Sequence, residues 1–419
     1  MKESHMKTIN NSFNESAYKF THKDGLEVII IHKEGFKRSV AAIGTPFGSI
    51  NLHQKYNGEV IEHKKGIAHF LEHKLFDDEG EDILAKFSKY GASANAFTSF
   101  DQTVYYFSTN LDLYEPLKLL LTFTNRFDIT EKSVEKEKGI IVEELKMYDK
   151  MPDMSLLMNT YQNVYHHFPM KFDIGGTEDS VNSTTLEDLK MAYKLNYHPK
   201  KMALVIITGE NPENIEDVVN SISITQDVLE VKDIFEKEPL DVVHEFHEID
   251  FPVKSNKMSL SFKFKYDVKD TLKDEFIMRL ILALNFTEFN DDYQNWLDEE
   301  IINDYFSYDV DLRDGFGVVY FFNEGNDAET FKNVISDTMS LLNLDRTCYN
   351  QIKKRYFGQT ILSLSQYDRY AINVLTSHFK GKSYYDYLSE IRDVTFENVS
   401  EVKDTMKDFS IALNVMREF

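Results

Sequence analysis

Short sequence patterns recur at a nearly constant spacing along this chain, and this repetition constrains the fold more than any other feature. Three pairs of similar segments follow one another in the same order, each pair about 210 residues apart: Val104–Phe107 with Val319–Phe322, Thr185–Leu189 with Thr395–Val399, and Met202–Val205 with Ile411–Asn414. A repeat of this length can bury a core of its own, unlike the short repeats of solenoids. The sequence therefore predicts two copies of one unit.

Strand-like and helix-like segments are mixed within the first copy, which is typical of an α+β fold. Residues 27–32 are short and β-branched, residues 95–109 alternate like paired strands, and residues 131–150 have helical periodicity. We expect two tandem homologous α/β units, each with a mainly antiparallel sheet and helices packed on it. An acidic, weakly periodic stretch between them is a predicted linker. The predicted division is an N-terminal domain at residues 1–225, a linker at 226–245 and a C-terminal domain at 246–419.

The charge and cysteine content exclude several classes of protein. The chain has 70 Asp and Glu against 47 Lys and Arg, a net charge of −23, which argues against binding to nucleic acid. Solubility explains this charge more simply than a preference for basic peptides. The single cysteine, Cys348, excludes an intrachain disulfide and a cysteine-based metal site. With no apolar leader at the N-terminus and only strand-length apolar runs, we expect a cytoplasmic protein without a membrane span.

The segment 66–76 contains a His-x-x-Glu-His pattern that suits a metal ion. On a helix, His69 and His73 are four residues apart and share one face, and Glu72 projects close to that face. Imidazole is a preferred zinc ligand, and a carboxylate beside the ion can act as a general base. The alternative is a helix with two solvated histidines, but the apolar neighbours predict a largely buried helix. The preceding stretch 63–65 is expected to be a solvated loop.

A third ligand is required, and the predicted helix at residues 131–150 offers two candidates. Glu137 and Glu144 are seven residues apart and lie on one face of that helix. One carboxylate can ligate zinc while the other orients a ligating histidine. The alternative is an ordinary solvated face on a charged helix, and only the histidine motif favours the metal interpretation.

Three segments, at residues 66–76, 91–107 and 134–147, resemble the corresponding blocks of the pitrilysin/insulinase family of zinc peptidases. The resemblance covers the N-terminal half and extends more weakly over the C-terminal half. It implies a fold like that of mitochondrial processing peptidase and the activity of a zinc metalloendopeptidase. It also implies residue roles: His69, His73 and Glu144 bind zinc, Glu72 is the general base, and Glu137 supports the site.

The same resemblance assigns a strand to substrate binding. Ala94, Asn95, Ala96 and Phe97 match the family's edge strand, beside which an extended peptide adds as a further strand. Such pairing reads the main chain of a substrate rather than one fixed side chain. For Asn95 and Phe97 ordinary strand packing is an equally good interpretation.

The C-terminal half departs from the family pattern in two places. Its counterpart of the metal helix, residues 275–286, has no His-x-x-Glu-His, so one zinc site per chain is expected. Relatives often carry an Arg and a Tyr seven residues apart that hold the substrate backbone. If Tyr305 is that tyrosine, the arginine position holds Asp298, whose carboxylate cannot donate a hydrogen bond to a substrate carbonyl.

These departures imply a partner. Small members of the family enclose the substrate in a chamber made from four units, and one chain supplies two. We expect a homologous partner subunit that lacks the zinc motif, in a heterodimer, with a homodimer as the alternative. The predicted function is peptide processing by a zinc-dependent endopeptidase that cleaves unfolded or short peptides. The alternative is a non-catalytic binding or assembly subunit of the same fold.

Overall fold

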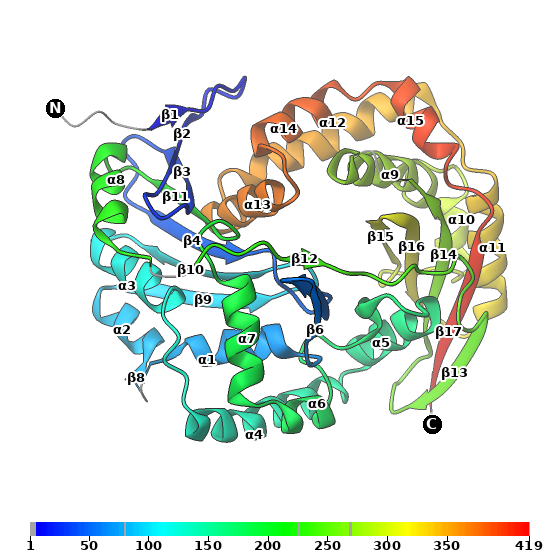
Figure 1. Cartoon of the computed structure of the whole chain (residues 1–419). Coiled ribbons are helices and arrows are strands. Elements are labelled where there is room, and N and C mark those ends of the chain that lie inside the picture. Colours follow the sequence, from blue (N-terminus) through cyan, green and yellow to red (C-terminus); the bar gives the residue numbers. More distant parts are fainter. Residues whose placement is uncertain (1–5, 79–80, 225–226, 268–269, 419) are drawn as a thin grey trace. The chain divides into compact units, whose positions relative to one another are not determined.

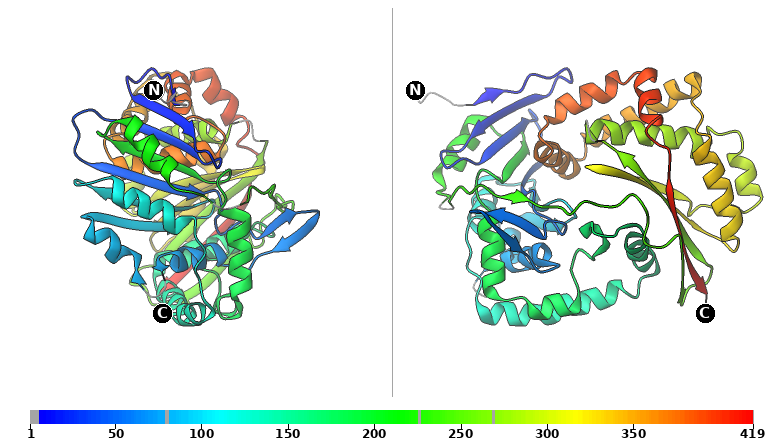
Figure 2. Two further views of the ribbon diagram at one scale, coloured as in Figure 1. Left: turned by 60° about the vertical axis from the view of Figure 1, so that its left-hand side comes forward. Right: turned by 45° about the vertical axis from the view of Figure 1, so that its right-hand side comes forward.

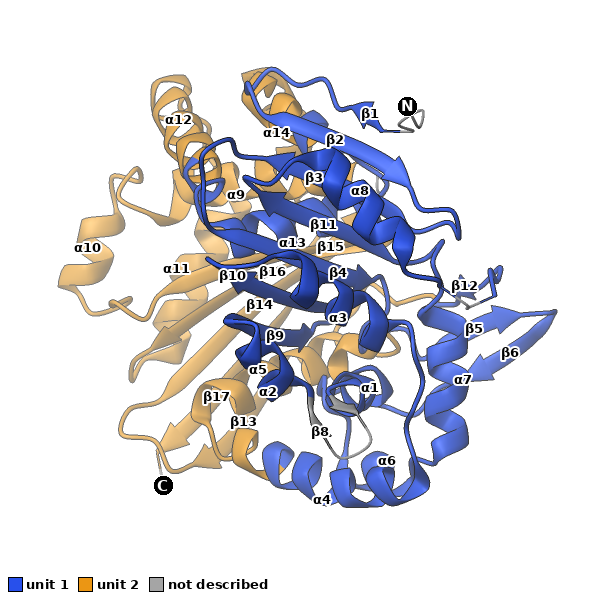
Figure 3. Cartoon of the chain, turned by 90° about the vertical axis from the view of Figure 1, so that its left-hand side faces the viewer, with its two compact units in different colours: residues 1–145, 172–235, 362–386 blue, residues 146–171, 236–361, 387–419 orange. Residues whose placement is uncertain are grey.

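The computed structural model describes residues 6–78, 81–224, 227–267 and 270–418 of the 419-residue chain. The chain forms two compact units, which Figure 3 colours separately. Unit 1 contains residues 1–145, 172–235 and 362–386, and unit 2 contains residues 146–171, 236–361 and 387–419. Residues 225 and 226, at the predicted junction of domain and linker, lie outside the described residues. The domain boundaries drawn along the sequence stay a prediction.

Unit 1 is built on a seven-stranded sheet (Figure 1). In sheet order its strands are β1 (Lys7–Thr8), β2 (Ser16–Thr21), β3 (Glu27–His32), β11 (Ala203–Thr208), β4 (Ser39–Thr45), β10 (Thr103–Thr109) and β9 (Ala92–Thr98). β3 and β11 pair in parallel and the other neighbours pair antiparallel. β9 is the last strand of this order, so among the described residues one of its edges has no neighbour in the sheet.

Helices cover both faces of the central strands. Every residue of β4 and β11 is buried, which explains their nearly continuous apolar sequences. Helices α1 (Ile67–Leu75) and α3 (Tyr114–Thr124) contact one face, and α13 (Tyr367–Phe379) contacts β4 and β11. Gly44 lets α13 approach closely, because a Cβ at this position would lie 3.3 Å from the ring of Phe379.

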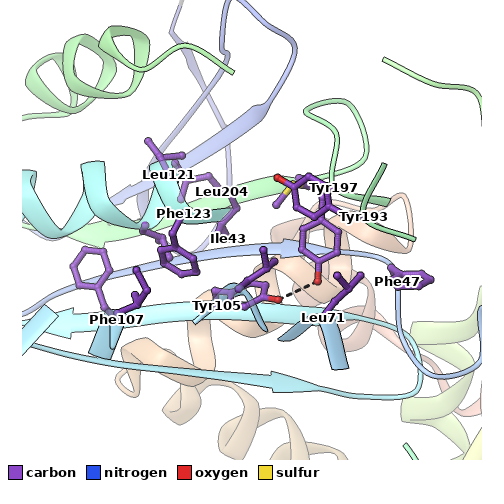
Figure 4. Packing of buried hydrophobic residues seen from close by; sticks show 14 of the residues in the cluster. Ile43, Phe47, Leu71, Tyr105, Phe107, Leu121, Phe123, Tyr193, Tyr197 and Leu204 are labelled. Atoms are coloured by element: carbon purple, nitrogen blue, oxygen red, sulfur yellow. Dashed lines mark hydrogen bonds between the residues drawn. The ribbon is translucent and has the colours of Figure 1, made fainter. Parts of the chain in front are cut away.

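A cluster of buried apolar side chains fills the face opposite α13 (Figure 4). Tyr105 of β10 lies in this cluster, and its hydroxyl is 3.0 Å from the hydroxyl of Tyr197. Leu71 of α1 points into the same cluster, so the core holds this helix against the sheet. The other side chains labelled there are Ile43, Phe47, Phe107, Leu121, Phe123, Tyr193 and Leu204.

The remaining elements of unit 1 surround this core. They are β5 (His53–Tyr56), β6 (Glu59–Glu62), β7 (Asp77–Asp78), β8 (Glu81–Asp82), α2 (Ile83–Lys89), α6 (Glu178–Ser183), α7 (Leu186–Asn196), α8 (Pro212–Ser221), β12 (Lys232–Asp233) and most of α4 (Glu131–Tyr148). β12, β5 and β6 form a small sheet, and the β5–β6 hairpin projects from the body of unit 1 (Figure 2).

Unit 2 repeats the central topology of unit 1. Its five-stranded sheet has the order β13 (Phe246–Phe251), β17 (Ser410–Glu418), β14 (Lys257–Tyr266), β16 (Gly315–Glu324) and β15 (Ser307–Arg313). β13 and β17 pair in parallel and the other neighbours pair antiparallel, as in the order β3-β11-β4-β10-β9 of unit 1. The prediction of two homologous units with mainly antiparallel sheets is therefore confirmed.

The other elements of unit 2 are helices. They are α5 (Pro152–Val164), the 3-10 helix η1 (Pro169–Lys171), α9 (Thr271–Phe286), α10 (Tyr293–Asp298), α11 (Ala328–Ser340), α12 (Arg346–Ser363), α15 (Phe396–Lys403) and part of α14 (Tyr384–Asp393). α5 contacts β14 and β17, and α9 contacts β15. Thr185 before α7 and Thr395 before α15 both form capping boxes, which is why this motif recurs in the sequence.

The predicted linker is divided between the two units, with residues up to 235 in unit 1 and residues from 236 in unit 2. β12 pairs with β5 in unit 1, and further along the chain Glu238 is buried in unit 2. Its carboxylate accepts hydrogen bonds from the main-chain N–H groups of residues 166–168 and from the ammonium group of Lys263. Within the described residues, no helix has both the length and the apolar character that crossing a membrane requires.

Candidate metal centre

Helix α1 carries the predicted metal motif, and a glycine fixes where it begins. Gly66 has a left-handed backbone with φ of +80°, and a Cβ there would lie 2.1 Å from the carbonyl oxygen of Gly175. His69, Glu72 and His73 share a partly exposed face of α1. The rest of the helix is anchored in unit 1 by its buried residues, which are Ile67, Ala68, Phe70, Leu71, Lys74 and Leu75.

The three predicted ligands converge. Nε2 of His69 and Nε2 of His73 lie 3.9 Å and 3.4 Å from Oε2 of Glu144. One potential ligand atom from each residue falls within 4.8 Å of the others, and in the described part of the chain no other group of three or more His, Cys, Asp or Glu residues meets this condition. Two ligands of a tetrahedral zinc ion are roughly 3.4 Å apart. The donor types and spacings therefore fit zinc.

Glu137 lies behind His73, as a residue that orients a ligand must. Its Oε1 is 3.1 Å from Nδ1 of His73, and its Oε2 accepts a hydrogen bond of 3.1 Å from Nζ of Lys74. Since Nδ1 of His73 faces Glu137, its Nε2 faces Glu144. Sequence reasoning missed Lys74, although a lysine on the buried side of an apolar helix requires a partner.

Burial and neighbouring charges shift the pKa values of the motif in different directions. Burial, together with the nearby His73, lowers the pKa of His69 to about 4. Burial alone would lower the pKa of His73 too, but hydrogen bonds to Glu137 and Glu144 outweigh it and raise the value to about 9. Burial raises the pKa of Glu72 above its usual range, and a hydrogen bond from Thr98 acts in the opposite direction. Glu72 is thus suited to take up and release a proton.

Thr98 links the motif to the edge strand. It is the last residue of β9, and its hydroxyl donates a 2.8 Å hydrogen bond to Oε2 of Glu72. Sequence reasoning did not include Thr98 among the site residues. Thr98 follows Ala96 by two residues and therefore lies on the same face of the strand, and this spacing could have identified it as a site residue.

Four of the five residues predicted to bind substrate lie in β9, at the edge of the sheet. Ala94 and Ala96 pack against the core of unit 1. Asn95 pairs with Tyr106 across the β9–β10 ladder, and its Oδ1 accepts a 2.9 Å hydrogen bond from the N–H of Ala96. Phe97 is partly buried. The structure thus places all four on an edge strand, and their role in binding substrate stays a prediction.

The residues considered in the C-terminal half belong to unit 2. Helix α9 follows β14 and lacks the metal motif. Tyr305 is 62% exposed, and Nζ of Lys257 lies 5.1 Å from the centre of its ring. Asp298 ends α10 and accepts a hydrogen bond from the amide group of Gln294. The role of Tyr305 in binding substrate stays a prediction.

The expected solvated loop before α1 is wrong for His63. Only 7% of this residue is exposed, and its Nε2 lies 2.8 Å from Oε1 of Gln54 on β5. Burial lowers the pKa of His63 to about 4. The charged neighbours Lys64 and Lys65 suggested that His63 is exposed to solvent. The hydrogen-bond partner that makes its burial favourable, Gln54, lies on β5 and is not one of these neighbours.

Comparisons with known proteins agree with this geometry. The model of the family described as Insulinase (Peptidase family M16) matches residues 30–178. The zinc protease YmfH of Bacillus subtilis (strain 168) is 33% identical over 402 residues, which are 93% of each chain. A protein of Schizosaccharomyces pombe (strain 972 / ATCC 24843) named as mitochondrial-processing peptidase subunit beta is 29% identical over 189 residues, 44% of this chain and 40% of that protein.

Solved structures share the fold. The crystal structure of an M16-like peptidase from Alicyclobacillus acidocaldarius has a TM-score of 0.91 and 25% identity, covering 98% of this chain and 100% of that one. An M16 peptidase inactive domain from Pseudomonas fluorescens has a TM-score of 0.75 at 13% identity, covering 97% and 98%. The second likeness concerns the fold alone.

Proposed function

Because this chain belongs to the insulinase family of peptidases, family M16, we propose that it is a zinc-dependent endopeptidase that cleaves unfolded or short peptides. The observation that carries the proposal is the convergence of His69, His73 and Glu144, with Glu72 beside them on α1. Zinc is the cofactor of this family of proteases. In this chain, His69, His73 and Glu144 would hold it.

The side chains around the metal have separate tasks in the proposed reaction. When bound, zinc polarises the scissile carbonyl and makes water more acidic. Glu72 accepts a proton from the attacking water and delivers it to the leaving amine. Burial raises the pKa of its carboxyl above the usual range, which makes the carboxylate a stronger base for the first half of this transfer. Glu137 holds the ring of His73 in place.

Edge strand β9 supports the choice of substrate class. A peptide that pairs with this edge must be extended, and its own main-chain groups must be free to form hydrogen bonds. Unfolded or short peptides satisfy both conditions, whereas segments inside a folded sheet or helix do not. Main-chain pairing also tolerates varied side chains, which suits peptide processing.

We also propose that the active form contains a homologous partner subunit without the zinc motif. If Tyr305 is the tyrosine of the pair that relatives often carry, Asp298 occupies the arginine position, and this chain then lacks that contact to the substrate. One relative of this chain is named as a subunit of mitochondrial-processing peptidase, and this name supports the proposal of a partner subunit. Peptide cleavage should rise when such a homologue is co-expressed and co-purified. If the protein is fully active as a monomer in size-exclusion chromatography, the proposal of a partner subunit is wrong. If it is fully active as a homodimer, the partner is a second copy of this chain rather than a homologue. The low cysteine content supports a cytoplasmic location for either assembly.

A non-catalytic subunit is the second candidate, and the aspartate at position 298 is the observation in its favour. The complete set of ligands and general base favours catalysis, because a subunit that only binds peptide does not need Glu72. The two candidates differ in whether the isolated chain, or the chain with its partner, hydrolyses a peptide bond.

The decisive experiment compares zinc content and cleavage of an unstructured peptide in the wild type, Glu72→Gln and Glu143→Gln. Glu143 is an exposed neighbour of Glu144 on α4 and provides the same chemical change outside the site. We expect Glu72→Gln to keep its zinc and to lose about 10²–10⁴-fold in kcat. Glu143→Gln should keep both. Cleavage by Glu72→Gln at the wild-type rate would refute the proposed mechanism.

A further inference from the structure

We propose that Thr98 is a positioning residue that holds Glu72 at the free edge of β9 and thereby sets where a bound peptide stops pairing with that strand. The inference rests on the proposed peptidase function and adds to it the register of the substrate. It concerns the hydrogen bond between Thr98 and Glu72, which joins the predicted substrate strand to the predicted general base.

The direction of the main chain at Thr98 follows from its neighbour. The N–H of Ser99 donates a 2.8 Å hydrogen bond to the carbonyl oxygen of Gln102, across the turn from β9 to β10. Main-chain groups of successive residues in a strand point to opposite sides. Those of Thr98 and Ala96 therefore point to the free edge. The Asn95 side chain that meets the N–H of Ala96 is consistent with this direction.

The turn that follows Thr98 is firmly held. The carbonyl oxygens of Ser99 and Phe100 accept hydrogen bonds of 3.1 Å from the N–H groups of Ser49 and Ile50. Gly48 permits this close approach, since a Cβ there would lie 2.3 Å from the carbonyl oxygen of Phe100. The end of β9 is thus a rigid support, and a hydroxyl fixed on it can restrict the rotation of a carboxylate.

Thr98 has a second anchor across the ladder. It pairs with Thr103 of β10, which is fully buried and whose hydroxyl donates a 2.8 Å hydrogen bond to the carbonyl oxygen of Phe47. With its own strand position fixed in this way, the Thr98 hydroxyl holds Oε2 of Glu72. A misplacement of about 1 Å in a catalytic group can lower a rate about 100-fold, so this restraint matters for catalysis.

The register of the substrate follows from the same contacts. Ala94 and Ala96 present main-chain groups to the free edge, where an added strand can pair with them. At Thr98 the carboxylate of Glu72, which both the hydroxyl and the main-chain N–H of Thr98 contact, occupies that edge instead. A peptide paired with β9 must therefore leave the strand at Thr98, beside the general base. The paired part of the substrate then lies on one side of the scissile bond.

Substitution of Thr98 tests the positioning role. Thr98→Val keeps the shape of the side chain and removes its hydroxyl, whereas Thr98→Ser keeps a hydroxyl. Thr109→Val is the control, because it makes the same change at the other end of the β9–β10 hairpin. There the hydroxyl of Thr109 donates a hydrogen bond to the carbonyl oxygen of Gly91. We expect Thr98→Val to lose about 10- to 100-fold in kcat with KM within about twofold. Zinc content and binding of an unstructured peptide to the metal-free protein should stay unchanged. Thr98→Ser should recover most of kcat, and Thr109→Val should keep it.

The outcomes separate the role of Thr98 from the proposed function. Wild-type kcat in Thr98→Val, equal losses in Thr98→Ser, or a rise in KM alone would overturn the positioning role while peptidase activity stands. A zinc-loaded wild type, with its partner, that cleaves no peptide would overturn the proposed function and the inference with it.

Backbone N-methylation of the peptide substrate, one position at a time, tests the register. Each methyl group removes one main-chain hydrogen-bond donor from the added strand. We expect the positions that weaken binding to alternate and to lie on one side of the cleaved bond. Sensitive positions on both sides of that bond would overturn the register.

Discussion

Replacement of Glu238 by glutamine should destabilise unit 2 strongly. The Lys263 side chain is fully buried, and its ammonium group donates hydrogen bonds to Oε1 of Glu238 at 2.6 Å and to the carbonyl oxygens of Val164 and Asp241 at 2.9 Å and 3.1 Å. Glutamine has nearly the shape of glutamate, so Glu238→Gln removes the negative charge without opening a cavity. The carbonyl groups remain, but the anion that balances the buried lysine is lost.

The size of the effect follows from the burial of both partners. Loss of one partner from a buried ion pair lowers the free energy of unfolding by about 3–5 kcal/mol, whereas an exposed pair contributes about 0–1 kcal/mol. Three main-chain N–H groups also donate to the Glu238 carboxylate, and a neutral amide oxygen binds them more weakly. With an m-value of about 2 kcal/mol per molar urea, the unfolding midpoint should fall by about 1.5–2.5 M.

Tryptophan fluorescence during urea unfolding measures this shift of the midpoint in unit 2, which contains Glu238. The chain has one tryptophan, Trp296, which is 7% exposed and lies in unit 2. Glu236→Gln is the matched control, because Glu236 lies two residues away and forms an exposed pair with His167 at 3.4 Å. Its midpoint should shift by no more than about 0.25 M, since surface changes are usually within about 0.5 kcal/mol.

The pH dependence provides a second check. Burial alone would raise the pKa of Glu238, but hydrogen bonds from Lys263 and from main-chain N–H groups outweigh it and hold the pKa below its usual value. A carboxylate with a lowered pKa stabilises the folded state above its unfolded pKa of about 4.3, and this contribution is lost as the pH falls through the folded value. The gap between wild type and Glu238→Gln should therefore be full at neutral pH and shrink below about pH 4. If Glu238→Gln unfolds at the same urea concentration as Glu236→Gln at pH 7, the argument from the buried ion pair is wrong.

Two further changes address the metal centre. Glu137→Gln should weaken zinc binding about 10- to 100-fold, because the amide holds Nδ1 of His73 less firmly. Competition with a fluorescent chelator measures the zinc affinity. An unchanged affinity would contradict the role of Glu137 in orienting His73. Gly66→Ala should lower the free energy of unfolding by at least about 1–2 kcal/mol, since the new Cβ requires a left-handed backbone and meets the carbonyl oxygen of Gly175. Thermal unfolding measures this loss of stability. Gly139→Ala is the control and should not be destabilised, because Gly139 lies in a helix with open space around it. If Gly66→Ala and Gly139→Ala have the same melting temperature, the steric argument is wrong.

Local spacing explains the parts of the molecule that sequence reasoning could predict. Four-residue and seven-residue separations place His69 with His73, and Glu137 with Glu144, on single helix faces, and the structure brings these faces together. The duplicated fold was predictable because Thr185 and Thr395 cap equivalent helices with the same local chemistry.

Contacts between distant segments explain what sequence reasoning missed. The bond from Thr98 to Glu72 depends on how β9 lies against α1, which no local pattern encodes. His63 finds its partner on β5, so its charged neighbours suggested an exposure that it does not have. A helical period does not say which sheet the apolar side of α5 will cover, and α5 contacts β14 and β17.

The composition of unit 1 has a consequence for how the protein is made. The seven strands of its large sheet all lie before residue 209, yet α13, which covers one face of β4 and β11, comes from residues 367–379. Ala371, Val374 and Leu375 of this helix are almost completely buried. On the ribosome, the large sheet of unit 1 must therefore wait for nearly the whole chain before that apolar face is covered. Chaperone binding to a half-made chain, and aggregation of any truncated one, are the expected costs of this order of synthesis.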